Sequence, residues 1–483
     1  MTSLPLNQPI PRVRPPARTR RGVRAVVREG AVRVARDPFR AALFALLVLT
    51  ISRIHQQISF LQSLRPALVL TGLAVIIAYA KPGLLSKDRL LSTWPAKLIA
   101  MFAGLACLSA PFGISLGHAA VFILNDYLKT IVLAFLIIVA IRGPRDFYGL
   151  VWAVVISTAL LLYTTLFVFK VKHYGGYDRL EGGDMYDAND LGLVLLVGMA
   201  FTLLAFQGAG AKGKAFCAVV LAGIGASISK SGSRGALIGL VALVLAFVVL
   251  IDGVSLGRRL AFVLVTGVAL AIFSPPGYWL QMKTILAPEA DYNWNAVNGR
   301  REVAARGVEY FKEYPVFGLG INNFSTAECT ISDKAVHHAT NTALRCTPPH
   351  NAYIEAMSEL GIGGILLWLL MIPGAVVSLL QARSRLPRAW AKGDPQQRFL
   401  YVAPQYMAVG FVGFSVGAFF LSFAWTDVTY ILVSSWAALM ISLRAAGGFK
   451  PIVTPSPRAV PNYRPSVLRP ASAGRPRVAP GAS

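Results

Sequence analysis

The chain alternates long apolar segments with short polar turns, and this pattern continues over most of its 483 residues. Runs of about 18 or more apolar residues are typical of helices that cross a bilayer. The pattern therefore predicts an all-α polytopic membrane protein with about twelve transmembrane helices. They are expected at residues 41–60, 65–80, 97–113, 118–141, 148–169, 190–207, 215–229, 235–251, 259–274, 361–380, 402–422 and 427–444.

One long polar block interrupts the apolar pattern. Between about Ser274 and Leu360 the apolar runs stop, and arginines, cysteines, histidines and a glycine-rich turn follow one another. A membrane protein that keeps one long polar loop is expected to carry out its chemistry there. The predicted organisation is a basic disordered tail (1–40), helices one to nine (41–274), a catalytic loop with short helices (275–360), helices ten to twelve (361–444) and a second basic disordered tail (445–483).

Composition and charge agree with a membrane protein. The chain is 55% hydrophobic and only 14% charged, yet its formal net charge is +25. No nucleic-acid partner is expected, because the basic residues are not interleaved with aromatic residues that would stack on bases. If the N-terminus is cytoplasmic, most loop Lys and Arg fall on the cytoplasmic side, as the positive-inside rule requires. Both tails are then expected in the cytoplasm and the polar block outside it, with anionic membrane lipid near the basic side.

The polar block contains two of the four cysteines, Cys329 and Cys346. A disulfide between them is expected, since the predicted topology places both in an oxidising compartment. Zinc is the alternative, because His337, His338 and His350 are near in sequence. Their spacing fits no standard zinc pattern, so no metal is expected.

A short helix is predicted early in the polar block, capped by Asn298 and ended by Pro315 after about Tyr314. Arg300 and Arg301 would lie in its first turn, where the helix dipole favours anions over cations. Two arginines placed against this preference favour an anionic partner, and the forked guanidinium suits a diphosphate. The alternative interpretation is two solvated charges.

His350 is the strongest single candidate for a catalytic residue. Two prolines precede it, and apolar residues follow at helical spacing, so it is predicted to open a helix that continues into the next membrane span. The dipole at a helix N-terminus disfavours imidazolium, and a neutral imidazole can act as a general base near pH 7. The alternative is a histidine that only caps the helix or completes a turn.

Two shorter features carry further candidates. The segment 230–235, between two predicted spans, contains Lys230 and Arg234, and an arginine at the membrane face can hold a lipid-phosphate head group or simply snorkel. Asp126 and Lys129 lie within one predicted span, where charges are costly, and form either a structural pair or a functional site. The run 315–324 has the composition of a tight turn and lacks the lysine of a phosphate cradle.

These motifs, in this order, resemble the membrane family of O-antigen ligases and O-antigen polymerases. The resemblance covers about residues 225–375, and the predicted topology extends it to most of the chain apart from the tails. It rests on Ser231–Ala236, Arg300–Arg301, Pro315–Gly320, His350–Tyr353 and Glu359–Gly361, with Asp187–Asp190 as a weaker match.

The resemblance implies a GT-C-like glycosyltransferase in the bacterial inner membrane, active on its periplasmic face without a metal or other cofactor. The donor would be a glycan on undecaprenyl diphosphate, and the acceptor a glycan, lipid A core or protein. By position, Arg234 and Arg300 or Arg301 would bind the diphosphate. His350 would take the proton of the acceptor hydroxyl as its oxygen attacks the anomeric carbon with inversion.

Lys230, Asn189 and Asn351, which lie in or beside these motifs, are expected as supporting residues. Two alternatives to a ligase remain. A polymerase of surface polysaccharide would use the same donor and a second lipid-linked glycan as acceptor. A transporter of an anionic solute would use the charged pair within the span at residues 118–141.

Overall fold

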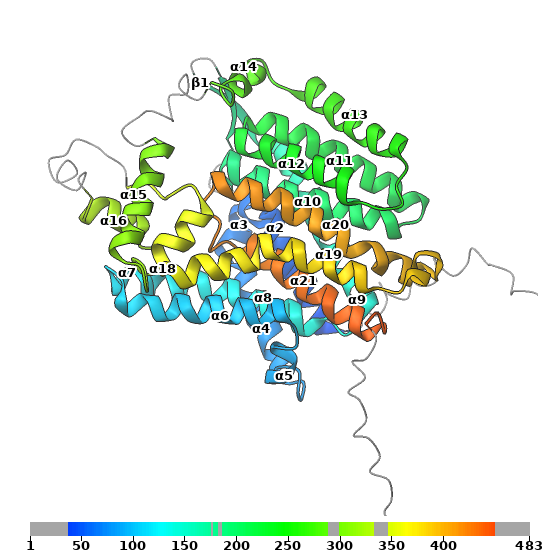
Figure 1. Ribbon diagram of the computed structural model, residues 1–483, viewed down its shortest axis with the longest axis horizontal. Coiled ribbons are helices and arrows are strands. Elements are labelled where there is room, and N and C mark those ends of the chain that lie inside the picture. Colours follow the sequence, from blue (N-terminus) through cyan, green and yellow to red (C-terminus); the bar gives the residue numbers. More distant parts are fainter. Residues whose placement is uncertain (1–36, 175–176, 182–185, 288–298, 333–345, 450–483) are drawn as a thin grey trace, which may run out of the picture.

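The structure, a computed structural model, describes residues 37–174, 177–181, 186–287, 299–332 and 346–449. Long helices run side by side in a bundle, and a group of short helices lies at one end of it, on the left in Figure 1. The bundle contains α2 (Pro38–Ser52), α4 (Pro66–Tyr79), α6 (Trp94–Ser109), α7 (Leu116–Phe122), α8 (Leu128–Ala140), α9 (Pro144–Tyr163), α10 (Ala188–Gly208), α11 (Ala211–Ser231), α12 (Arg234–Leu250), α13 (Leu256–Phe273), α18 (Ala352–Met371), α19 (Pro373–Arg385), α20 (Pro395–Gly417) and α21 (Asp427–Ala445).

Shorter elements connect these helices. The short α-helices are α3 (Ser59–Ser63), α5 (Lys87–Leu90), α14 (Tyr278–Lys283), α15 (Arg300–Glu313) and α16 (Phe324–Thr330). The 3-10 helices are η1 (Ile54–Gln57), η2 (Ala110–Phe112), η6 (Arg388–Lys392) and η7 (Ala418–Phe420), and π-helical turns are η3 (Ile123–Tyr127) and η4 (Thr164–Val168).

The prediction of a multi-pass membrane protein is confirmed. Within the described residues, nine helical segments are long and apolar enough to cross a membrane. The other three predicted spans coincide with the shorter apolar helices α2, α4 and α12. The 15 residues of α2 span only about 22 Å at a rise of about 1.5 Å per residue, less than the roughly 30 Å of bilayer hydrocarbon. The structure thus places helices at all twelve predicted positions without confirming twelve crossings.

The prediction of an all-α fold class is also confirmed, and one short hairpin adds to it: β1 (Lys170–Tyr174) and β2 (Tyr177–Glu181) pair antiparallel between α9 and α10. The tenth span was predicted at residues 361–380 as the continuation of a helix that opens at His350, and α18 begins at Ala352.

The centre of the bundle is formed by α10, which packs against α9, α11, α12 and α20. The apolar stretch of α10 is 83% buried, whereas that of α13 is only 6% buried. Helix α13 contacts mainly α11, at the edge of the molecule. Small residues allow the central helices to approach closely: Gly239 of α12 faces the Gly413 carbonyl of α20. Such close contacts are typical of helix packing within membranes.

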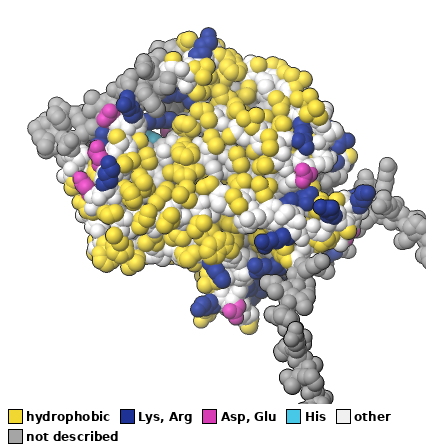
Figure 2. All heavy atoms as spheres, viewed as in Figure 1, with side chains coloured by type: hydrophobic (Ala, Val, Ile, Leu, Met, Phe, Trp, Pro, Cys, Tyr) yellow, Lys and Arg dark blue, Asp and Glu magenta, His cyan; other side chains and the backbone are white. Residues whose placement is uncertain are grey.

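The two ends of the bundle differ in charge. At one end, Lys81 after α4 pairs with Asp37 before α2 at 2.6 Å, and Arg444 of α21 donates to the Ser92 carbonyl at 2.7 Å. We call this the basic end. Figure 2 shows apolar side chains across the middle of one face, with Lys and Arg gathered towards the lower right. The opposite end, which carries α15, α16 and the first residues of α10, α12 and α18, is called the site end.

Candidate active site

His350 lies immediately before α18 rather than within it. Asn351 is the N-cap, and its Oδ1 accepts hydrogen bonds from the N–H groups of Tyr353 (2.9 Å) and Ile354 (3.2 Å). The helix therefore begins two residues later than predicted. His350 is only partly buried and has a left-handed backbone with φ of 49°, and its N–H donates to Ser422 Oγ at 2.9 Å.

Arg234 is the first residue of α12. The preceding Ser233 caps this helix and donates from Oγ to Asn189 Oδ1 of α10 at 2.7 Å. The partly buried guanidinium of Arg234 donates from Nη1 to Thr284 Oγ1 at 2.7 Å, so α12 contacts the segment that follows α14. Lys230 instead donates to the Leu166 carbonyl at 3.3 Å, which ties α11 to η4, the π-helical turn after α9.

The segment 418–426, between α20 and α21, joins the starts of α12 and α18. Phe420 packs so closely on Gly235 that an added Cβ there would lie 2.8 Å from the Phe420 Cβ. Two residues further on, Ser422 accepts the hydrogen bond from His350, and the Ala424 N–H donates to Glu355 of α18 at 2.9 Å. The structure therefore brings the Arg234 and His350 backbones to one short segment.

The start of α10 reaches the same end through Tyr186. Its hydroxyl donates to the Ile51 carbonyl at 3.1 Å, and the Arg53 guanidinium lies 4.0 Å from its ring centroid. Burial raises the pKa of Tyr186 to about 12, against the opposing charge of Arg53, so the hydroxyl stays a hydrogen-bond donor near neutral pH. Three helices, α10, α12 and α18, thus begin at the site end, and their dipoles favour an anion there.

The two arginines of α15 differ in their surroundings. Arg300 is partly buried and Arg301 is exposed. Arg300 shares one helix face with Val303 and Gly307, which are buried, and a side chain at Gly307 would overlap Ile354 of α18. This face lies against the first turns of α18, so Arg300 is the arginine on the side of His350. The predicted cap, Asn298, lies outside the described residues, and Gly299 occupies the N-cap position.

The glycine-rich run between α15 and α16 is locked onto α18. The N–H groups of Leu319 and Gly320 donate to the Ser358 and Glu359 carbonyls at 2.8 and 3.0 Å. Gly318 and Gly361 both have φ of 67°. A side chain at Gly318 would overlap the backbone of Glu359, and a side chain at Gly361 would overlap the backbone of Pro315 and Val316. The run is therefore a packing motif, and these N–H groups do not form a phosphate cradle.

Glu359 is the residue of α18 that holds the glycine-rich run in place. This structural role was not identified from the sequence. Glu359 is 2% exposed, and its carboxylate accepts from the N–H groups of Asn322 (2.6 Å) and Phe324 (2.9 Å) and from Trp425 Nε1 (2.8 Å). Glu355, one turn earlier, is 5% exposed and accepts the Ala424 N–H. Two carboxylates four residues apart in an otherwise apolar segment were the available signal, since such charges are costly in a membrane.

An ion pair holds α15 against α16. Arg306 binds Glu328 through two hydrogen bonds of 2.7 and 2.5 Å, and the Tyr310 hydroxyl donates to the same carboxylate at 3.0 Å. Burial opposes the charge of Arg306, but Glu328 outweighs it and the net pKa of the guanidinium is raised. Because the guanidinium of Arg306 is engaged by Glu328, we do not assign Arg306 to ligand binding.

Cys329 of α16 is joined by a disulfide to Cys346, with their Cα atoms 5.4 Å apart. The bond connects α16 to the short stretch that leads to His350. Of the zinc alternative, His337 and His338 lie outside the described residues. Among the residues that are described, no group of three or more His, Cys, Asp or Glu is arranged to hold a metal ion.

The charged pair considered for transport lies on the outside of the bundle. Lys129 Nζ and Asp126 Oδ1 are 3.2 Å apart, and their side chains are 48% and 63% exposed. A transport site is expected to face the interior or a water-filled cavity. This placement removes the feature that favoured a transporter.

A comparison with protein families gives independent evidence on the reaction class. Residues 217–369, from within α11 to near the end of α18, match the family model described as O-antigen ligase. This segment of the chain is thus similar to the O-antigen ligase family. The matched segment contains Arg234, Arg300 and His350, and it supports an activity of the ligase or polymerase type in general. No curated protein matches the chain.

Proposed function

We propose that the protein is a ligase-type glycosyltransferase that moves a glycan from undecaprenyl diphosphate to an acceptor hydroxyl. The observation that carries the proposal is the meeting of His350 and the Arg234-bearing start of α12 on the segment 418–426. His350 and Arg234 both lie within the matched residues 217–369. The match to the family model supports the reaction class, and this geometry supports which residues act. The acceptor is a lipid A core, a protein or another glycan.

In the proposed reaction, a ring nitrogen of His350 takes the proton from the acceptor hydroxyl. The freed oxygen attacks the anomeric carbon from the face opposite the diphosphate, so the configuration inverts. The bond from that carbon to the diphosphate oxygen breaks, and the lipid diphosphate leaves. A positioned general base is worth roughly 10²–10⁴ in rate.

Arg234 and Arg300 are the proposed partners of the departing diphosphate. Negative charge grows on the bridging oxygen as the bond breaks, and preorganised cations stabilise that charge. The starts of α10, α12 and α18 add the positive ends of three helix dipoles at the same end. With this set of cations we propose that the reaction needs no metal ion. Arg301, which is exposed, is proposed to contribute less.

We further propose that the site end faces the periplasm and that the basic end and both tails face the cytoplasm of a bacterial inner membrane. The charge difference between the two ends supports this orientation through the positive-inside rule. A cysteine placed at Glu313, an exposed residue of α15, should react with a membrane-impermeant maleimide in intact spheroplasts. Labelling only after lysis would refute the orientation.

The proposed function is tested in cells. The gene is deleted and complemented with wild type, His350→Ala or, as a matched control, His118→Ala. His118 lies on α7 and contacts Asn322 at 3.2 Å on the far side of the glycine-rich run. Loss of surface glycan with accumulation of lipid-linked donor is expected for His350→Ala only. Full restoration by His350→Ala would refute the mechanism.

The same strains separate ligase from polymerase. Lipid A or protein that lacks its glycan, beside full-length glycan on the lipid carrier, identifies a ligase. Glycan that is still attached to its final acceptor but reduced to single repeat units identifies a polymerase.

A further inference from the structure

The short helix α14 lies at the site end, next to the start of α12. It follows α13, whose apolar stretch is long enough to cross a membrane, and it packs against β2, which in turn contacts α10 and α11 (Figure 1). Directly after α14, Thr284 accepts the hydrogen bond from Arg234 at 2.7 Å. On the outer face of α14, Trp279 and Leu280 are exposed. Helix α14 therefore connects the proposed diphosphate-binding arginine to an apolar surface at the end of a membrane helix.

The inner face of α14 carries two polar atoms that are buried and unpaired. The side chain of Tyr278 is fully buried, and its hydroxyl has no hydrogen-bond partner in the part of the chain that the structure describes. The same holds for the side-chain carbonyl oxygen of Gln281, three residues later on the same face. Burial raises the pKa of Tyr278 to about 12, so its hydroxyl keeps its proton and remains a donor near neutral pH. Because buried polar groups are nearly always hydrogen-bonded, an unpaired donor and an unpaired acceptor on one face indicate a polar ligand.

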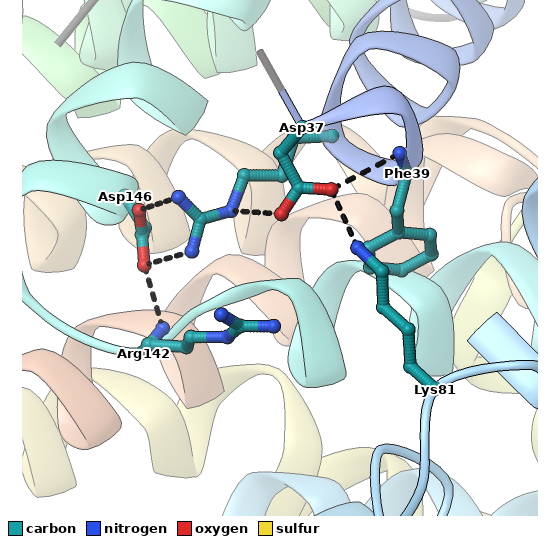
Figure 3. Close-up of polar contacts among 6 residues, drawn as sticks. Asp37, Phe39, Lys81, Arg142 and Asp146 are labelled. Carbon is teal, nitrogen blue, oxygen red and sulfur yellow. Dashed lines mark hydrogen bonds and ion pairs between the residues drawn. The ribbon is translucent and has the colours of Figure 1, made fainter. Parts of the chain in front are cut away.

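The charged groups at the basic end are paired within the protein instead. Arg40 binds Asp146 at 2.8 and 3.0 Å and Asp37 at 3.7 Å, and Lys81 binds Asp37 at 2.6 Å. Figure 3 shows these side chains converging from three separate segments of the chain. These charges are satisfied by the fold itself, unlike the two polar atoms of α14.

We propose that α14 is a lid over the diphosphate site and that the lipid-linked donor enters beneath it. The diphosphate replaces Thr284 on the Arg234 guanidinium, because arginine binds a diphosphate more strongly than a neutral hydroxyl. The hydroxyl of Tyr278 then donates to a diphosphate oxygen, and the carbonyl oxygen of Gln281 accepts from a hydroxyl group of the first sugar. Both polar atoms of the lid thus find their partners in the donor. The inference rests on the proposed function, since it takes Arg234 as a partner of the diphosphate.

The lid is tested by the binding of glycan-free undecaprenyl diphosphate to the full chain in nanodiscs. Tyr278→Phe removes a hydrogen bond to the diphosphate and should weaken binding about tenfold. It should not lower the unfolding temperature, because the lost hydroxyl has no partner within the described residues. Thr284→Val removes a group that the diphosphate must displace and should tighten binding about threefold. Opposite shifts are expected of a lid and not of a helix that only supports the fold.

Tyr406→Phe is the matched control for the loss of a buried phenol hydroxyl. Tyr406 of α20 is buried and packs on Phe247, which lies about 20 Å from Arg234 along α12. Binding of undecaprenyl diphosphate by this variant should stay within about twofold of wild type.

Two further probes identify what the lid recognises. Gln281→Leu should weaken binding of a glycan-bearing lipid diphosphate about fivefold and leave binding of the glycan-free lipid unchanged. Inorganic pyrophosphate should compete at least about a hundredfold more weakly than the lipid, because the polyprenyl chain holds the lipid in the membrane beside Trp279 and Leu280.

The outcomes separate this inference from the proposed function. Binding that Arg234→Ala weakens, but that Tyr278→Phe and Thr284→Val leave unchanged, would overturn the lid and keep the proposed function. Weaker binding in both α14 variants, an equal loss in Tyr406→Phe or equal competition by pyrophosphate would also overturn the lid. A loss in Gln281→Leu that is the same for both lipids would overturn the contact with the sugar. Wild-type protein that does not bind undecaprenyl diphosphate would overturn the proposed function together with the lid.

Discussion

The contact between Gly361 and the glycine-rich run leads to a quantitative prediction for Gly361→Ala. Gly361 has φ of 67°, and an added Cβ would lie 2.5 Å from the carbonyl oxygens of both Pro315 and Val316. The backbone angles of Gly361, φ 67° and ψ −155°, lie in a region that is essentially restricted to glycine, and an alanine held there costs about 1–3 kcal/mol. The run must also move away, which weakens the hydrogen bonds from Ile362 N–H to Pro315 O and from Leu319 N–H to Ser358 O, each 2.8 Å long.

These two hydrogen bonds add about 1 kcal/mol each, so Gly361→Ala should lower the free energy of unfolding by about 3–5 kcal/mol. The assay is reversible unfolding by SDS in mixed micelles, followed by tryptophan fluorescence. Gly104→Ala in α6 is the matched control, because an added Cβ there meets no atom within 4 Å. Alanine is the better helix former by about 1 kcal/mol, so this control should unfold no more easily than wild type.

The reasoning is refuted if Gly361→Ala is as stable as wild type, or if Gly104→Ala loses as much. The first result would mean that the run does not depend on this glycine. The second would mean that any added methyl group in these helices is harmful, whatever the backbone conformation.

Three further predictions follow from the site and the basic end. Arg300→Ala should lower kcat/KM for the lipid-linked donor by roughly 10–100-fold, the equivalent of about 1.5–3 kcal/mol, whereas Arg301→Ala should change it less than threefold; equal losses would contradict the assignment of the inner face. Cys329→Ser should leave the protein in the membrane but reduce transfer several-fold and speed proteolysis before His350, and a variant with wild-type rates would show that the disulfide does not position this stretch. Burial alone would raise the pKa of Asp37, but Lys81 and Arg40 lower it overall. The ionised Asp37 carboxylate therefore stabilises the fold at a pH above the usual aspartate pKa of 3.8, and this stabilisation is lost as the pH falls below about 4. Between pH 7 and pH 3 the unfolding temperature should fall less for Asp37→Asn than for wild type, and an equal fall in both proteins would contradict this.

The sequence was sufficient to predict where the membrane helices lie, because each apolar run stops at polar or proline-containing turns. Arg234 and His350 could be selected as candidates from the sequence, since each stands at or just before the start of a helix beside a recognisable motif, and their roles stay predictions. The three short helices could not be separated from true spans, because hydropathy counts apolar residues and does not reveal where the backbone ends a helix.

The contacts that build the site could not be predicted. Glu359 binds two backbone N–H groups that lie about 35 residues earlier in the chain, and no local pattern encodes such pairing. The choice between Arg300 and Arg301 depends on which face of α15 meets α18, a tertiary fact. The segment 418–426 carries no motif of its own, although His350 and Glu355 both bond to it.

The central claim is that His350 acts as the general base for glycan transfer from a lipid diphosphate. The most direct measurement uses purified protein in nanodiscs with a lipid-linked glycan and follows release of lipid diphosphate together with product. We predict one lipid diphosphate per glycosidic bond, and a rate at least about 10²-fold lower for His350→Ala with unchanged donor affinity. Transfer by His350→Ala at the wild-type rate, or lipid diphosphate released without any new glycosidic bond, would contradict the account.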